Sequence, residues 1–214
     1  MSRNDKSAGF RGKLPDALRA NMVAMQNELE SAMVVLQRAE ILESLRQASA
    51  AAPRRRVVDL KEELERSLAL IRPIVPPSAQ LDVSLDPGLA NVFADPAQLH
   101  HVVLALCSHA AAAIVGPHGR IGVTAVRANV RERTRRELGL VVDGPHALIA
   151  VADNGARPDP VDVDAIFKCE ASGLGVAREI VRHHYGALHA HSGPVRGTCF
   201  SLWLPTTAQA AEAI

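Results

Sequence analysis

Three short glycine-bearing elements follow one another along this chain, and they constrain its fold more than any other feature. Residues 153–155 read Asp-Asn-Gly directly after the apolar run 147–152, which predicts a buried strand. Residues 172–175 read Ser-Gly-Leu-Gly and open the helical pattern 174–184, whose glycine-led N-terminus favours a bound anion. Residues 197–205 alternate between two faces, which predicts a final strand. An acidic residue followed by glycine at a strand end suits close approach of the backbone to a bound group.

Together with the helical stretch 95–114, these elements have the order found in one protein family. They resemble the ATP-binding domain of sensor histidine kinases, a family shared with DNA gyrase and MutL, over residues 57–205. The resemblance implies an α/β fold, a two-layer sandwich of the Bergerat type, in which helices cover one face of a mixed sheet. An N-terminal helical arm would precede that domain.

The resemblance also implies a nucleotide site. Asp153 matches the family's carboxylate that accepts the adenine amino hydrogen, and Thr198 stands where the family lines the adenine pocket. His109 stands at the family's magnesium position, where it either donates a hydrogen bond to a phosphate or is a packed histidine. The other matching positions are Gly155, Gly173, Leu174 and Gly175.

Several departures from the family pattern affect the chemistry. Ala105 and His109 replace two asparagines, and magnesium prefers oxygen ligands, so we expect no magnesium site and only weak binding of ATP or ADP. Arg157 replaces a glycine, and the lid is reduced to residues 168–172. Residues 1–99 contain no histidine, so the helical arm offers no phosphoacceptor.

The stretch from residue 14 to about residue 49 predicts one long helix. A helix about 50 Å long cannot bury an apolar seam by itself. We therefore expect a homodimer through residues 14–50, with packing on the same chain as the alternative. The seam follows the a/d spacing of a helical bundle, at Leu18, Met22, Met25, Leu29, Ala32 and Leu36.

The chain is expected to divide into four parts: a flexible tail at 1–13, a helical arm and linker at 14–56, the ATPase-like domain at 57–205 and a C-terminal tail at 206–214. The linker, 48–56, carries three consecutive arginines, which predict a solvated segment; contact with phosphate or an acidic partner is the alternative.

Local patterns place further elements within the domain. Asp59 and Asp95 are predicted N-caps of helices that run to about residues 71 and 114. The remaining predictions are a hairpin-like pair of strands at 81–85 and 92–94, a strand at 121–130 and a solvated basic loop at 131–136.

Bulk composition excludes several classes of protein. With 48% apolar and 22% charged residues the chain is globular, and a formal net charge of +1 gives no argument for a nucleic-acid partner. The three cysteines are not spaced as metal ligands and fit packing in a reducing cytosol. No apolar run approaches the roughly 18 residues of a membrane span, so we expect a cytoplasmic protein without a membrane partner.

These observations favour a degenerate histidine-kinase-like protein, a pseudokinase of two-component signal transduction. It would lack autophosphorylation and act by binding a partner histidine kinase or response regulator. The alternative is an active ATP-binding histidine kinase that phosphorylates a partner in trans.

Overall fold

The computed structural model describes residues 16–50, 52–76, 79–114, 118–155, 165–168, 173–192 and 197–208. The chain divides into two compact units, Met1–Gln37 and Arg38–Ile214, and each is described by itself. No helix in the described part of the chain is both long enough and apolar enough to cross a membrane.

Helix α1 (Asp16–Ala50) is the long helix that the sequence predicts. The large apolar side chains of its seam are exposed, from 51% at Leu18 to 63% at Leu36. Met33, which lies beside the seam, and Val23, which lies on another face of the helix, are exposed as well. The dimer that the seam predicts stays a prediction.

One layer of the domain is a five-stranded sheet, and it is mixed, as the sequence predicts. Its order is β2-β4-β5-β7-β6, with β2 parallel to β4 and every other neighbouring pair antiparallel. The strands are β2 (Ala79–Leu85), β4 (Gly119–Val130), β5 (Gly144–Asp153), β6 (Ala187–Ser192) and β7 (Thr198–Pro205). The sequence gives no separate sign of β6, because its Ala-Leu-His-Ala-His-Ser segment is short and only weakly apolar.

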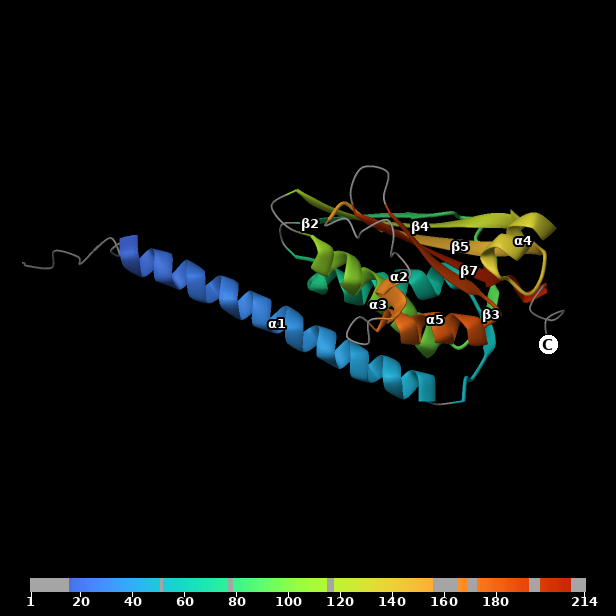
Figure 1. Ribbon diagram of the computed structural model, residues 1–214, viewed down its shortest axis with the longest axis horizontal. Coiled ribbons are helices and arrows are strands. Elements are labelled where there is room, and N and C mark those ends of the chain that lie inside the picture. The colour runs from blue at the N-terminus through green and yellow to red at the C-terminus, as the bar shows by residue number, and fades with distance from the viewer. Residues whose placement is uncertain are drawn as a thin grey trace, which may run out of the picture. The chain divides into compact units, whose positions relative to one another are not determined.

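Three helices cover one face of this sheet (Figure 1). They are α2 (Leu60–Ile71), α3 (Pro96–Ala113) and α5 (Leu174–His183). Alternate residues of β4, β5 and β7 point into the core that the helices and sheet share, because successive side chains of a strand face opposite sides. The two-layer sandwich is therefore confirmed.

Both predicted helix caps are present. The Asp59 carboxylate accepts a hydrogen bond from Glu62 N at 3.0 Å at the start of α2. The Asp95 carboxylate accepts from Ala97 N at 2.9 Å and from Gln98 N at 3.4 Å, and proline at the first position favours the α3 start.

The predicted hairpin is wrong. Strand β3 (Val92–Ala94) pairs antiparallel with β1 (Arg56–Val58) in a separate two-stranded sheet, whereas β2 pairs with β4. Asp86 N bonds to Ala125 O, which extends the pairing of β2 with β4, and Leu89 N bonds to Asp86 O in the turn that follows. A parallel β2–β4 pair needs a crossover, and α3 supplies it.

The predicted basic loop is also wrong, because residues 132–138 form helix α4 (Glu132–Leu138). Its arginines are paired: Arg133 Nε lies 2.9 Å from Glu137 and Arg136 bonds to Glu132, both at the i,i+4 spacing that supports a helix. Gly139 ends the helix in the left-handed conformation, with φ of 65°. The i,i+4 spacing of oppositely charged residues and the glycine at residue 139 are sequence signals for this helix that the prediction of a loop overlooked.

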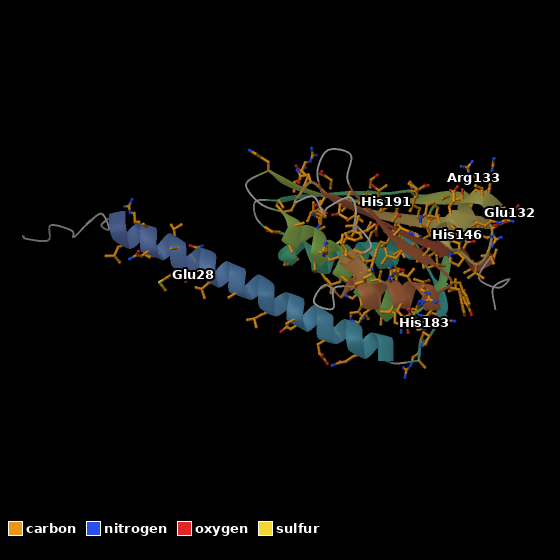
Figure 2. All side chains as sticks on the ribbon, viewed as in Figure 1. Glu28, Glu132, Arg133, His146, His183 and His191 are labelled. Atoms are coloured by element: carbon orange, nitrogen blue, oxygen red, sulfur yellow. The ribbon has the colours of Figure 1, made fainter. Side chains whose placement is uncertain are left out.

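Helix α4 packs beside the opposite face of the sheet. Leu138 and Trp203 border a small cluster of buried residues there, Val130, Leu140 and Ala187. His189 Nε2 lies 2.9 Å from Leu138 O, which fixes the end of α4 on strand β6. Figure 2 labels Glu132 and Arg133 at this end of the sheet.

Candidate functional site

The sheet register brings two of the predicted site residues together. Ala152 of β5 is paired with Cys199 of β7, so Asp153 at the end of β5 lies beside Thr198 at the start of β7. Both side chains are on the helix-covered face and both are buried. A carboxylate at the mouth of a buried face is the arrangement that the sequence predicts.

Backbone hydrogen bonds hold the Asp153 carboxylate in place. Gly155 N donates to Oδ1 at 2.8 Å and Thr198 N donates to Oδ2 at 3.3 Å. Burial raises the pKa of this carboxyl, and the two hydrogen bonds oppose that rise. Each carboxylate oxygen can accept more than one hydrogen bond, so acceptor capacity remains for an amine such as that of adenine.

Asn154, the middle residue of the Asp-Asn-Gly element, has a structural role. Its side-chain oxygen accepts from Arg120 N at 2.7 Å, and its amide nitrogen donates to His118 O at 2.9 Å. These bonds tie the end of β5 to the start of β4. They thereby fix the backbone on which Asp153 is carried.

Glycines allow close backbone contacts around the site. A Cβ at Gly155 would lie 2.2 Å from Ala113 O, and a Cβ at Gly175 would lie 2.6 Å from Phe167 O. Gly155 therefore allows the end of β5 to pack against α3, and Gly175 allows residues 165–168 to pack against α5.

Gly197 is a site residue that sequence reasoning missed. It has a φ of 77°, and a Cβ there would lie 2.0 Å from Asp153 O and 2.7 Å from its Oδ1. Its position directly before Thr198 was the available signal. Gly197 lets the start of β7 come against Asp153, so it positions the carboxylate.

Helix α5 begins at the second glycine-bearing element that the sequence singles out. Gly173 is its N-cap in the left-handed conformation, with φ of 67°, and makes no side-chain capping bond. The side chain of Leu174 is fully buried and packs in the core, so it does not contact a ligand. The free N–H groups and dipole of a helix N-terminus favour an anion such as phosphate.

His109 lies in a row of rings. Its imidazole is half-buried and meets the Phe200 ring edge-to-face, with centroids 5.4 Å apart. Phe200 meets Phe167 in the same way at 6.4 Å, and the Arg178 guanidinium lies 4.5 Å from the Phe167 centroid. Of the two readings of His109 that the sequence leaves open, this geometry favours the packed histidine.

The donor set at this position does not fit magnesium. His109 offers nitrogen, the Ala105 side chain is apolar and buried, and Phe200 presents carbon, whereas magnesium prefers oxygen ligands. Among the residues that the structure describes, no group of three or more His, Cys, Asp or Glu side chains is placed to hold a metal ion. Arg157 and residues 169–172 of the short lid lie outside the described residues.

Comparison with known sequences agrees with this geometry. Residues 94–208 match the family described as histidine kinase-, DNA gyrase B-, and HSP90-like ATPase. The sensor histidine kinase ZraS of Klebsiella oxytoca is 34% identical over 161 residues, which are 71% of this chain and 32% of ZraS. ZraS of Escherichia coli strain K12 is 33% identical over 157 residues, 69% of this chain and 30% of that protein. The chain thus spans about a third of the length of these curated relatives.

Solved structures of histidine kinases share the fold. The mycobacterial sensor histidine kinase MprB has a TM-score of 0.56 at 24% identity, over 71% of this chain and 97% of that chain. Full-length ShkA in complex with AMPPNP has a TM-score of 0.59 at 18% identity, over 91% of this chain and 40% of that chain. At these identities the likeness concerns the fold alone.

Proposed function

Because the chain belongs to the histidine kinase-, DNA gyrase B-, and HSP90-like ATPase family, we propose that it is a degenerate member of two-component signalling. In this proposal the protein binds ATP or ADP weakly and without magnesium, does not phosphorylate itself, and acts by engaging a partner histidine kinase or response regulator. The observation that carries the proposal is a contrast between two positions. The Asp153 carboxylate is held by hydrogen bonds from Gly155 N and Thr198 N, as an acceptor for adenine would be. His109, at the position where the family resemblance implies a magnesium ligand, packs on Phe200 instead.

The adenine half of the site supports nucleotide binding. Asp153 is oriented by Gly155 and Thr198, and the dipole at the N-terminus of α5 favours a phosphate. Without a metal, the phosphate charge would be met by helix dipole and backbone alone. Each lost 1.4 kcal/mol or so weakens affinity about tenfold, so we expect micromolar binding or weaker.

Calorimetric titration with ATP and ADP, with and without magnesium, tests this directly. We expect weak binding whose affinity changes less than about threefold when magnesium is added, a difference under roughly 0.7 kcal/mol. His109→Asn is the matched variant, because it returns an oxygen donor to the magnesium position and should make binding more sensitive to magnesium. Sub-micromolar affinity in the unchanged protein, or strong enhancement by magnesium, contradicts the proposal.

The absence of autophosphorylation rests on the sequence of the arm. No histidine occurs in residues 1–99, so α1 carries no acceptor. Incubation with labelled ATP should leave this chain unlabelled. Acid-labile, base-stable label on the protein would refute the expectation.

The alternative is an active kinase that phosphorylates a partner in trans. It is favoured by the retained geometry of Asp153 and of the glycines that surround it. The two functions separate in one reaction, in which labelled ATP and magnesium are supplied with a histidine kinase whose own ATPase domain is inactive. Label on that partner supports the active kinase, and an unlabelled partner that nevertheless binds this chain supports the degenerate one.

We propose that the arm, residues 14–50, holds a homodimer in the cytoplasm and that residues 57–205 are the ATPase-like domain. Leu29 and Met25 are each 62% exposed on the seam, and burying each large side chain would contribute about 1.5–3 kcal/mol. Methionine adapts to different surfaces, which suits exchange between a self-dimer and a partner. Removal of residues 1–52 should leave a monomeric domain.

Leu29→Glu tests the dimer by light scattering, because a carboxylate buried at the seam would lack a partner. Ala24→Glu is the matched control, since residue 24 is off the seam and exposed, as is nearby Glu28 (Figure 2). We expect a monomer from the first variant and a dimer from the second. A full-length protein that is monomeric, or a dimer that survives removal of residues 1–52, would show that the arm does not hold it.

A further inference from the structure

The segment between α1 and α2 is attached to the domain, where the sequence predicts a solvated linker. Arg54 N donates to Asp95 Oδ2 at 2.6 Å. The Arg55 guanidinium donates to His183 O and lies 5.3 Å from the centroid of the Tyr185 ring. His183, labelled in Figure 2, is the last residue of α5. The linker is thus fastened at the start of α3 and at the end of α5.

His184 joins these two fastening points. Its Nδ1 lies 2.8 Å from Ile180 O, and its Nε2 lies 2.9 Å from Asp95 N. A carbonyl oxygen can only accept and a backbone N–H can only donate, so Nδ1 carries the proton and Nε2 is the acceptor. The geometry therefore requires a neutral imidazole.

Little around His184 would favour a charged ring. The residue is 4% exposed. A small cavity beside it is otherwise lined by apolar side chains, those of Ala94, Leu99, Val102, Ile180, Val181 and Leu204. Burial is the largest influence against a positive charge at His184, and the guanidinium of Arg55 and the imidazole of His183 also oppose one. The hydrogen bond to the Ile180 carbonyl and the Asp95 carboxylate favour the charged ring, but burial outweighs them.

Protonation of Nε2 would disturb the linker whichever way the ring responds. A protonated Nε2 faces the Asp95 N–H with a second donor, so that hydrogen bond is lost. If the ring turns instead to the Asp95 carboxylate, it competes with Arg54 N and with the first turn of α3 for the same oxygens. A shift of residue 184 also moves its neighbour His183, whose carbonyl holds Arg55.

We propose that His184, Asp95, Arg54 and Arg55 form a proton-operated latch, in which neutral His184 keeps the linker on the domain and protonated His184 releases it. The latch links acidity to the freedom of the arm, and it operates with or without nucleotide. Burial lowers the pKa of His184 below its ordinary value of 6.5, so release occurs on the acidic side of neutrality.

Amide hydrogen exchange of the full chain, followed by NMR, tests the latch. The Arg54 and Asp95 amides are the donors of the two hydrogen bonds that release breaks. Between about pH 7.5 and about pH 5.5, we expect their protection factors to fall about tenfold more than that of Ile149 in the core. Each pH unit below the pKa of His184 raises the ratio of protonated to neutral His184 about tenfold. The imidazole nitrogen shifts of His184 should change with the same midpoint.

Two variants distinguish release of the linker by protonation of His184 from a general loss of protection at acidic pH. His184→Gln keeps a neutral acceptor near Nε2 and removes the titration, so the linker amides should stay protected at the lower pH. His183→Gln, at the exposed neighbour, should behave as the unchanged protein does. Release that persists in His184→Gln overturns the proposal. If that variant does not fold, the unchanged protein decides: linker amides that stay protected while His184 takes up its proton also overturn it.

Discussion

Gly197→Ala is the substitution for which the structure predicts the clearest loss. Gly197 has a φ of 77°, a conformation that costs an L-residue about 1–2 kcal/mol. The added Cβ would also lie 2.0 Å from Asp153 O, far inside ordinary contact, so the start of β7 must move away from β5. Overpacking of a dense interior costs about 1–3 kcal/mol more. Together these two costs should lower the free energy of unfolding by about 2–5 kcal/mol.

Gly139→Ala is the matched control. Gly139 has a φ of 65°, and a Cβ there would meet no atom within 4 Å. This variant therefore carries the conformational cost of about 1–2 kcal/mol without the collision. The difference between the two variants isolates the contact between Gly197 and Asp153.

Urea unfolding followed by the fluorescence of Trp203, the only tryptophan, gives both free energies. At a temperature where both variants are folded, Gly197→Ala should also bind ATP at least tenfold more weakly, because the displaced strand changes the Asp153–Thr198 geometry. Gly139→Ala should bind as the unchanged protein does. Equal stabilities of the two variants, or unchanged ATP binding in Gly197→Ala, would refute the positioning role of Gly197.

Three further predictions follow from single groups. Asp153→Asn should weaken ATP binding about tenfold or more in calorimetry, since a hydrogen bond to a charged group contributes about 1.5–3 kcal/mol. An unchanged affinity would show that Asp153 does not bind adenine. Burial lowers the pKa of His146 and of His184, so at acidic pH the unfolded state binds protons that the folded state does not. The free energy of unfolding should therefore fall as the pH drops below about 6.5, by up to about 1.4 kcal/mol per pH unit for each histidine. A free energy of unfolding in urea that stays constant between about pH 7.5 and about pH 5.5 would contradict this. Burial raises the pKa of Cys107 to about 12, so alkylation of Cys107 should require global unfolding, and mass-spectrometric labelling as fast as that of half-buried Cys199 would refute it.

The elements with strong local signals were predictable from the sequence. Helices α2 and α3 begin directly after their N-caps, Asp59 and Asp95, as the sequence indicates, and the alternation of residues 197–205 identifies β7. Pairing of strands was less accessible. The partner of β3 is set by packing beside the helical layer, and no local pattern distinguishes that pairing from a hairpin with β2.

The candidate site was predictable in composition and less so in geometry. The position of Asp153 beside Thr198 follows from the order of the motifs, and the register confirms it. Gly197 was missed because its role arises from a contact between segments about forty residues apart in sequence. The linker contacts were missed for the same reason, since Arg54 and Arg55 meet groups that only the fold brings near.

The buried carboxylate of Asp153 carries a cost in the folded state. Its hydrogen bonds to Gly155 N and Thr198 N stabilise the charged carboxylate, yet burial outweighs them and raises the pKa of this carboxyl. A group whose charged form is disfavoured in the folded state weakens the fold at neutral pH, so its contribution to stability is negative there. A bound amine donor supplies a further hydrogen bond to the same oxygens and offsets that cost. If the proposed function is correct, ATP or ADP binding should therefore raise the unfolding temperature of the unchanged protein more than that of Asp153→Asn.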